Sequence, residues 1–140
     1  MPTAIPDDVR IRPAAATELL PVMRLLDGAM LDIERATVQT RIDTEDVYVA
    51  VRSSTDRILG VIVVDTTHDA RSRIEAIAVR STVRDRDIGT ALIERIDDGS
   101  TPIVAEFDAS ARPFYRSLGF AITSIDDGDR FRGRYDPSSN

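Results

Sequence analysis

The chain has 140 residues, of which 42% are hydrophobic, and its length predicts a single domain over residues 1–140, with residues 136–140 as a frayed tail. Its 24 acidic and 18 basic residues give a formal charge of -6, which argues against nucleic acid or a membrane surface as partner, because both are polyanions. With no cysteine and one histidine, His68, the composition excludes disulfides, thiol catalysis and a His-rich metal site, so no metal is expected. No apolar stretch approaches the roughly 20 residues that span a bilayer, and no apolar signal core is seen, so a cytoplasmic protein is expected.

The N-terminal half alternates between strand and helix patterns. Residues 9–12 alternate apolar and charged side chains, which predicts a short half-buried strand. Thr17 is the predicted N-cap of a helix with Pro21 near its beginning, and its apolar residues at helical spacing are Leu19, Leu20, Met23, Leu26 and Leu31. A second helical segment is predicted over residues 31–42. The β-branched runs 47–52 and 58–64 flank a turn-rich gap, which predicts an antiparallel hairpin.

The C-terminal half continues the alternation. Residues 73–79 predict a third central strand, residues 86–98 an amphipathic helix ended by Gly99, and residues 102–107 a further strand. Residues 110–118 predict a short helix closed by Gly119, followed by a hairpin of residues 120–125 and 130–135. The resulting order is β-α-α-β-β-β-α-β-α-β-β. It predicts the α/β class, with a mixed sheet and helices on its faces.

The basic residues are all arginine, and 18 of the 24 acids are aspartate. A short-chain acidic surface without lysine suits a high-salt cytoplasm, where a Debye length of about 3 Å at 1 M salt screens the self-repulsion. This pattern predicts a halophilic protein. Replacement of lysine codons by arginine codons in a GC-rich genome gives the same composition and remains an alternative.

The junction between the third central strand and the following helix is the first segment that suggests chemistry. Arg80, Arg84 and Arg86 lie in or next to the loop, and Gly89 lies in the first turns of the helix. The first amides of a helix have no internal acceptor and carry a partial positive charge, so they can bind phosphate oxygens. Arginine-rich helix starts are also commonly solvated, and this segment alone leaves both interpretations open.

The second such segment is residues 107–120. Asp108 or Ser110 can cap the short helix, and Pro113 fits its first turn. Tyr115 has a phenol with a reference pKa of about 10, so it is protonated at neutral pH and able to donate a proton. A purely structural interpretation, with packed aromatic rings and Tyr115 reaching to the surface, explains the same residues.

In this order the two segments resemble the GNAT superfamily of acyl-CoA-dependent N-acyltransferases. The family's loop has the form Gln/Arg-x-x-Gly-x-Gly/Ala, and here residues 84–89 read Arg-Asp-Arg-Asp-Ile-Gly. Its second motif, Asn-x-x-Ala-x-x-Phe/Leu-Tyr followed by Gly-Phe, is matched by Asp108, Ala111, Phe114, Tyr115, Gly119 and Phe120. The likeness extends over nearly the whole chain. Two positions depart from it, because Asp87 replaces the first glycine of the loop and Asp108 replaces the asparagine.

The resemblance implies acetyl-CoA as a co-substrate and assigns residues to it. The backbone of Ile77, Ala78 and Val79 would pair with the pantetheine arm. Tyr115 would protonate the departing thiolate or donate a hydrogen bond to the thioester sulfur, and a backbone amide of the same strand would stabilise the oxyanion. Asp108 and Ala111 belong to the matched cofactor-binding motif. The pyrophosphate would lie on the amides of Arg84, Asp85, Arg86, Asp87, Ile88, Gly89 and Thr90.

The resemblance also implies direct attack of a primary amine on the thioester in a ternary complex. Glu75 is the first candidate for the general base, acting through one water, and Glu106 is the second. Each is equally explained as an exposed acid of an acidic protein, and some family members need no dedicated base. The acceptor, a small-molecule amine or a protein or peptide amine, would lie between residues 30–46 and the hairpin around residues 126–130. The acidic surface hints at a cationic acceptor, and pairing of the C-terminal strands into a homodimer fits the pattern.

Asp87 raises an alternative to efficient catalysis. A carboxylate about 4 Å from the pyrophosphate would cost roughly 4 kcal/mol at an effective dielectric constant near 20, before screening by water and salt. Asp87 could instead turn outward to Arg84 or Arg86. A catalytically weak CoA-binding sensor or partner module therefore stands beside the enzyme hypothesis.

Overall fold

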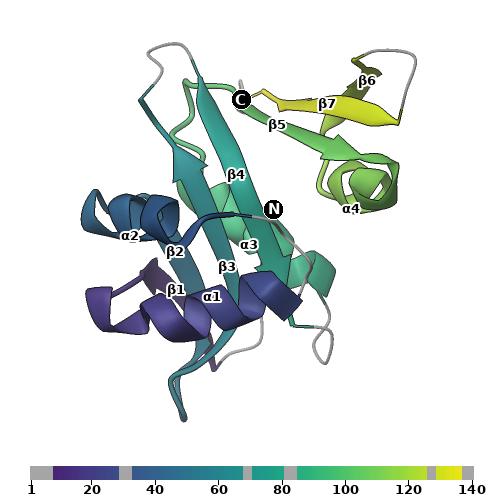
Figure 1. The fold of residues 1–140 in the computed structure, drawn as a ribbon. Helices are drawn as coiled ribbons and strands as arrows, with labels where there is room; N and C mark the ends of the chain where they lie inside the picture. Colours follow the sequence, from purple (N-terminus) through teal and green to yellow (C-terminus); the bar gives the residue numbers. More distant parts are fainter. Residues whose placement is uncertain (1–7, 29–32, 68–70, 81–84, 126–128, 137–140) are drawn as a thin grey trace.

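The computed structural model describes residues 8–28, 33–67, 71–80, 85–125 and 129–136. Within this part, seven strands form one sheet in the order β1-β2-β3-β4-β5-β7-β6 (Figure 1). No described helix is long and apolar enough to cross a membrane. The element order matches the one predicted, which confirms the fold class. The elements are β1 (Val9–Pro13), η1 (Ala16–Glu18), α1 (Leu19–Gly28), α2 (Arg35–Asp43), β2 (Val47–Arg52), β3 (Arg57–Asp65), β4 (Ser72–Val79), α3 (Asp85–Ile96), β5 (Ile103–Asp108), η2 (Ala109–Ala111), α4 (Arg112–Ser117), β6 (Ala121–Ser124) and β7 (Arg130–Tyr135).

The central strands β2, β3 and β4 are covered on both faces. Helices α1 and α2 lie across one face and α3 lies on the other (Figure 1). Val61 and Val63 of β3 pack with α1 and α2, whereas Leu59 and Ile62 of the same strand pack with α3. A strand buried on both faces needs apolar residues at every position. This explains why the run over residues 58–64 is continuously apolar and does not alternate.

A β-bulge in β4 marks the place where the sheet opens. Val63 pairs with Ala76 and the next residue, Val64, pairs with Ile74, so Glu75 is an extra residue on β4. An extra residue bends the strand and increases its twist. On the other edge of β4, the parallel pairing with β5 covers Ser72 and Arg73 and extends no further in the described residues. Beyond it, β5 turns away from β4 together with β7, β6 and α4 (Figure 1).

The structure corrects the predicted start of the first helix. Thr17 does not cap it, because this residue lies within the 3-10 turn η1. The backbone N–H of Ala15 instead donates to the carboxylate of Glu18 at 2.8 Å, and Arg12 holds that carboxylate from β1. Leu20, predicted on the apolar face, is 48% exposed. The spacing of apolar residues identified the helix, whereas the turn before it is held by the Ala15–Glu18 hydrogen bond and by the Arg12–Glu18 pair.

The predicted helix boundaries between residues 28 and 35 are also corrected. Helix α1 ends at Gly28, and Leu31, expected in it, lies outside the described residues. Helix α2 begins at Arg35 after an extended Glu34, not at residue 31. Its buried residues Val38 and Ile42 lie four positions apart on one face of the helix. They are the only buried residues of α2, so the helical pattern of apolar residues is short in this segment.

Gly133 of β7 provides the space for the aromatic cluster that supports the open half of the sheet. A Cβ at this position would lie 3.0 Å from Phe120 Cδ2 and 3.1 Å from Phe107 Cε1. We predict that Gly133→Ala lowers the free energy of unfolding by about 1–3 kcal/mol through overpacking, measured by chemical denaturation. Gly28→Ala is the control, since nothing lies within 4 Å of its added Cβ. Equal stability of both variants would contradict the prediction.

Candidate active site

A cleft of about 610 Å³ lies where β4 and β5 part. Glu75 and Ile77 line it from β4, and Glu106 and Asp108 line it from β5. Tyr115 lines it from α4. The fold thus brings the tyrosine and both candidate bases to one cavity, although residues 75 and 115 are 40 positions apart in the sequence.

Helix α4 positions Tyr115 through local signals at both of its ends. The carboxylate of Asp108 accepts a hydrogen bond from the backbone N–H of Ser110 at 3.0 Å, so Asp108 caps the turn that leads into α4. Gly119, with φ at +96°, ends the helix in the left-handed conformation that favours glycine. The structure therefore assigns the cap to Asp108, one of the two residues that the sequence offered.

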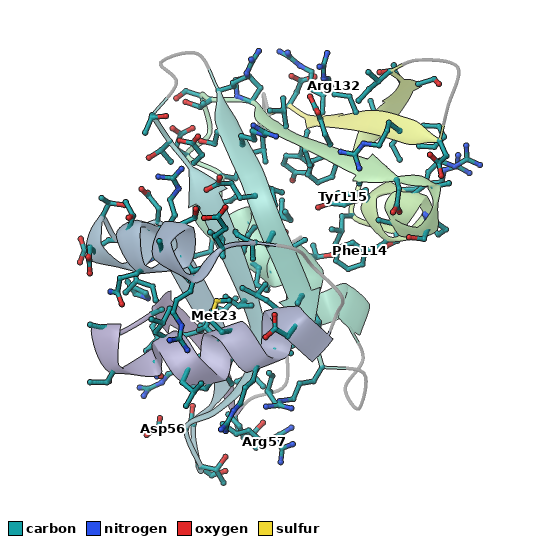
Figure 2. All side chains as sticks on the ribbon, in the orientation of Figure 1. Met23, Asp56, Arg57, Phe114, Tyr115 and Arg132 are labelled. Carbon is teal, nitrogen blue, oxygen red and sulfur yellow. The ribbon has the colours of Figure 1, made fainter. Side chains whose placement is uncertain are left out.

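Tyr115 is buried among aromatic rings. Its ring stacks on Phe107 with centroids 4.2 Å apart, and Phe114 and Phe120 contact it edge-on. Figure 2 shows Tyr115 and Phe114 on the side of α4 that faces β4. Only 7% of Tyr115 is exposed, so the interpretation of a ring that reaches to the surface is wrong. Its hydroxyl has no hydrogen-bond partner among the described residues.

Burial raises the pKa of the Tyr115 hydroxyl well above its ordinary value, because the phenolate would lose its hydration. The hydroxyl therefore stays protonated across the neutral and mildly alkaline range. A neutral phenol facing a cavity can donate a hydrogen bond to a ligand atom placed there.

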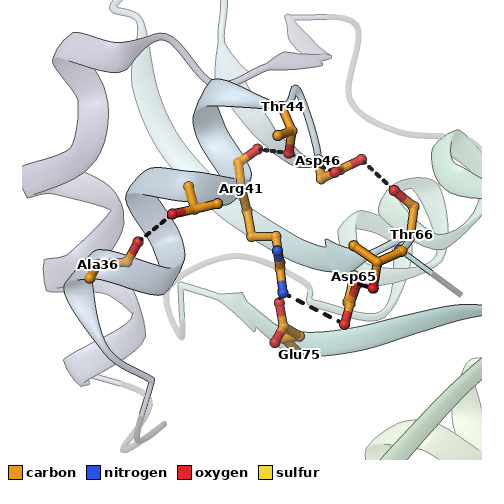
Figure 3. A network of polar contacts seen from close by, with 9 residues as sticks. Ala36, Arg41, Thr44, Asp46, Asp65, Thr66 and Glu75 are labelled. Atoms are coloured by element: carbon orange, nitrogen blue, oxygen red, sulfur yellow. Dashed lines mark hydrogen bonds and ion pairs between the residues drawn. The ribbon is translucent and has the colours of Figure 1, made fainter.

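Glu75 forms an ion pair that the sequence did not predict. Arg41, on α2, donates from Nε to Glu75 Oε1 at 2.5 Å, and its Nη2 lies 3.6 Å from Asp65 Oδ2 on β3 (Figure 3). The hydrogen bond with Glu75 raises the pKa of Arg41, so the guanidinium stays charged. The pair joins residues 34 apart, and no local pattern around Arg41 indicates it. Glu75 Oε2 keeps its lone pairs for a water or a ligand, as far as the described residues show.

Glu106 also has an arginine partner. Arg132 of β7 donates to Glu106 Oε2 at 2.9 Å, which is the main cause of a lowered pKa of Glu106. Nearby Arg73 and Arg130 lower it further. A carboxylate held in its ionised form by cations is a weaker base. Glu106 therefore combines a place in the cleft with a reduced affinity for protons.

The β4 edge predicted to hold the pantetheine arm lies next to the cleft. Ile77, Ala78 and Val79 pair with β3 along one edge of β4. Their other edge faces the space that β5 has left, and no described strand pairs with it. Peptide groups along such an edge are available to an extended ligand. Ala111 lines the cleft from the opposite side.

The predicted phosphate segment is described in part. Helix α3 begins at Asp85, and Arg84 lies outside the described residues, as do the side chains of Asp85, Arg86 and Asp87. The first backbone N–H groups of the helix, from Asp85 to Ile88, have no acceptor within the helix.

The remaining residues of this segment have packing roles in the structure. Ile88 is buried in the core, and Thr90 is half-buried. A Cβ on Gly89 would lie 3.3 Å from Leu118 and 3.4 Å from Phe114, so the small residue lets α3 approach the segment of α4. His68, the single histidine of the chain, lies outside the described residues.

Arg80 differs from the solvated arginine expected in this segment. Its side chain folds back on β3, where Nε donates to the carbonyl oxygen of Ile58 at 2.7 Å. The backbone N–H of Arg80 donates to the carbonyl oxygen of Leu59. These two contacts fix the start of the loop that leads to α3.

The raised pKa of Tyr115 predicts its titration. Absorbance titrations of the wild type and of Tyr115→Phe should differ by one ionisation, which occurs above the ordinary tyrosine value of about 10. Circular dichroism at each pH shows whether the fold persists. An ionisation of Tyr115 at or below pH of about 10 in the folded protein would contradict the burial described here.

Residues 43–122, more than half of the chain, match the family described as acetyltransferase (GNAT) domain. The chain belongs to the GNAT acetyltransferase family. It is therefore an enzyme of the acyltransferase class, as the sequence predicted. A comparison with curated proteins by sequence gave no match.

Solved structures share the fold at low identity. Ard1 from Thermoplasma volcanium superimposes with a TM-score of 0.78 at 17% identity, over 94% of this chain and 99% of that one. Diaminobutyrate acetyltransferase EctA from Paenibacillus lautus, in complex with its substrate and coenzyme A, gives 0.72 at 16% identity over 94% and 96%. Arabidopsis thaliana Naa50, with the bisubstrate analogue CoA-Ac-MVNAL, gives 0.71 at 18% over 92% and 99%. At these identities the likeness concerns the fold alone.

Proposed function

We propose that this GNAT protein transfers the acetyl group of acetyl-CoA to a primary amine by direct attack in a ternary complex. The observation that carries the proposal is the cleft between β4 and β5, where the buried Tyr115 hydroxyl and the Glu75 carboxylate face one cavity. The amine nitrogen forms a bond to the acetyl carbon and the C–S bond breaks. The amine's proton goes to a base, and the thiolate takes a proton to become CoA thiol.

Acetyl-CoA fits this cleft as an added strand partner. The free edge of β4 at Ile77, Ala78 and Val79 offers peptide groups to the pantetheine arm, whose amides are spaced for such pairing. The first turn of α3, from Asp85, offers amides and a partial positive charge to the pyrophosphate. EctA from Paenibacillus lautus, which shares the fold, was solved with coenzyme A. A backbone amide of β4 beside the thioester would stabilise the oxyanion of the tetrahedral intermediate.

Tyr115 serves as the donor to the leaving sulfur. Its raised pKa opposes complete transfer of the proton to a thiolate, whose reference pKa is about 8.5. A hydrogen bond that strengthens as negative charge develops on sulfur avoids this cost and still stabilises the transition state. Of the two roles considered for Tyr115, donation of a hydrogen bond agrees better with its buried surroundings.

Glu75 remains the first candidate for the general base. Arg41 occupies its Oε1 and fixes the carboxylate beside the cleft, which leaves Oε2 to accept a proton from the amine through one water. Glu106 is the second candidate, and its lowered pKa reduces its strength as a base. Arg41 is a positioning residue in this scheme, since it acts through Glu75.

Replacement of Tyr115 tests the proposed donor. Tyr115→Phe should lower kcat by about 10- to 100-fold and leave the calorimetric Kd for acetyl-CoA within about twofold, because the lost hydrogen bond acts mainly in the transition state. CoA thiol release with an amine panel measures turnover. Equal losses in affinity and turnover would contradict the donor role. Absence of acetyl-CoA binding to the wild type at low and molar salt would refute the proposed function itself.

Replacement of Glu75 tests the base. Glu75→Gln should lower kcat by about 100-fold at neutral pH and recover at alkaline pH, where the amine acceptor is already deprotonated. Glu106→Gln is the matched comparison, because it removes the other carboxylate of the cleft. A full pH profile of kcat/KM measures both. A larger loss in Glu106→Gln would move the assignment to Glu106, and no loss in either would point to acceptors that arrive deprotonated.

A further inference from the structure

A groove lined by arginines adjoins the cleft on the same side of the sheet as α1 and α2. Its volume is about 370 Å³, and we call it the arginine groove. The strand register shows on which side of the sheet the groove lies. Arg73 pairs with Asp65, and Asp65 contacts Arg41 of α2, so Arg73 faces the side of α1 and α2. Val104 pairs with both Arg73 and Arg134, which places Arg134 on the same side. Four arginines from two separate parts of the chain line it: Arg71, Arg73, Arg132 and Arg134.

The groove carries an excess of positive charge in an acidic protein. Arg132 pairs with Glu106 at 2.9 Å and Arg134 pairs with Asp136 at 2.7 Å. Arg71 and Arg73 are exposed, and the charge of Arg73 contributes to the lowered pKa of Glu106 in the same groove. The chain as a whole has a charge of -6, so a groove lined by four arginines and one carboxylate, Glu106, is a local reversal. Guanidinium groups in such positions favour carboxylates, which they bind through paired hydrogen bonds.

The groove and the cleft are neighbours. Glu106 lines both. The groove lies where β4 and β5 are still paired, and the cleft begins where they part. Arg71, directly before β4, precedes Glu75 by four positions, which is about 13 Å of extended chain. That span exceeds the length of one free amino acid and corresponds to about four residues of extended peptide.

We infer that the acceptor is a peptide whose residues next to the reactive amine carry acidic side chains. This inference rests on the proposed acetyl transfer in the cleft. The amine lies beside Glu75, and the following residues run along β4 and β5 so that their carboxylates meet Arg73 and Arg71. A polynucleotide is less favourable in this place, because Glu106, Asp136 and the overall negative charge repel a long polyanion. The cationic acceptor suggested by the acidic surface is disfavoured by the same arginines.

Three synthetic peptides with one N-terminus test the charge preference. In the acidic peptide the next three residues are Asp and Glu, and in the neutral peptide they are the isosteric Asn and Gln. In the basic peptide they are Arg. CoA thiol release should give a kcat/KM about tenfold higher for the acidic peptide than for the neutral one, and lowest for the basic one. The preference should shrink at molar salt, where exposed charges are screened. Equal rates for acidic and neutral peptides, or faster acetylation of free aspartate and glutamate than of the acidic peptide, would overturn the inference.

Arginine variants connect the preference to the groove. Arg71→Gln/Arg73→Gln should lower kcat/KM for the acidic peptide to about that of the neutral peptide and leave the neutral rate and acetyl-CoA affinity unchanged. Arg73→Glu should lower kcat/KM for the acidic peptide further and raise it for the basic peptide. Arg57→Gln is the control, because Arg57 is exposed at the end of the molecule away from Arg132 (Figure 2). Equal losses on all peptides, or the same effect in Arg57→Gln, would refute a role of the groove.

Two further outcomes separate this inference from the proposed function. Acetyl-CoA binding with rapid acetylation of small amines and none of peptides would refute the peptide acceptor and leave acetyl transfer intact. Absence of acetyl-CoA binding would refute both. Tighter binding of a single-stranded oligonucleotide than of the acidic peptide, measured by fluorescence anisotropy and lost in Arg71→Gln/Arg73→Gln, would assign the groove to nucleic acid and overturn the inference.

Discussion

The separation of β4 from β5 is the constraint on which the other features of this protein depend. The two strands are hydrogen-bonded at Ser72 and Arg73. Two positions further on, Glu75 is an extra residue in the pairing of β4 with β3, and this bulge bends β4. A bulge changes the direction of a strand, whereas the neighbouring strand β5 is held by β7 and α4. The result is an open strand edge inside a folded domain, which is otherwise an energetically unfavourable arrangement because peptide groups remain without partners. An extended ligand that completes the sheet at this edge removes the cost.

The two halves of the sheet are stabilised in different ways. Strands β2, β3 and β4 are buried on both faces beneath α1, α2 and α3. Strands β5, β6 and β7 bury one face against aromatic rings, among which Phe107 and Phe120 close around Gly133. Their other face is exposed and carries the charged residues of the arginine groove. One wall of the cleft therefore comes from β4, which is buried on both faces, and the other comes from β5, which is buried on one face. The face of the cleft that opens to solvent is polar.

Charge placement within the cleft follows from the same geometry. Glu75 and Glu106 are each held by an arginine from another element, Arg41 and Arg132. An ion pair across elements fixes the direction of each carboxylate, although at partly exposed positions it contributes little to stability. Tyr115 is held differently, by stacking and edge contacts, and its burial keeps it neutral. The cavity thus presents charged acceptors and a neutral donor to whatever binds there.

The sequence by itself determined the elements and several of their ends. Continuous apolar runs, helical spacing, Asp108 as a cap and Gly119 as a terminator act over a few residues, so their effects are visible in the local order of residues. The element order and the fold class follow from them. The placement of Tyr115 on a short helix followed as well, because cap, proline and glycine all lie within twelve residues.

Only the tertiary structure decided how distant residues meet. Residues far apart or on different elements are joined by the bulge at Glu75, by its pairing with Arg41 and by the Arg12–Glu18 pair. The same holds for the alignment of Arg71 and Arg73 with Arg132 and Arg134. Each depends on strand register and on the packing of helices over the sheet, which are fixed by the summed burial of the whole core and not by any one segment. For this reason Tyr115 and Glu75 could be named as candidates from residue type and motif, whereas the residues that pair with and orient the cleft carboxylates, Arg41 and Arg132, could not.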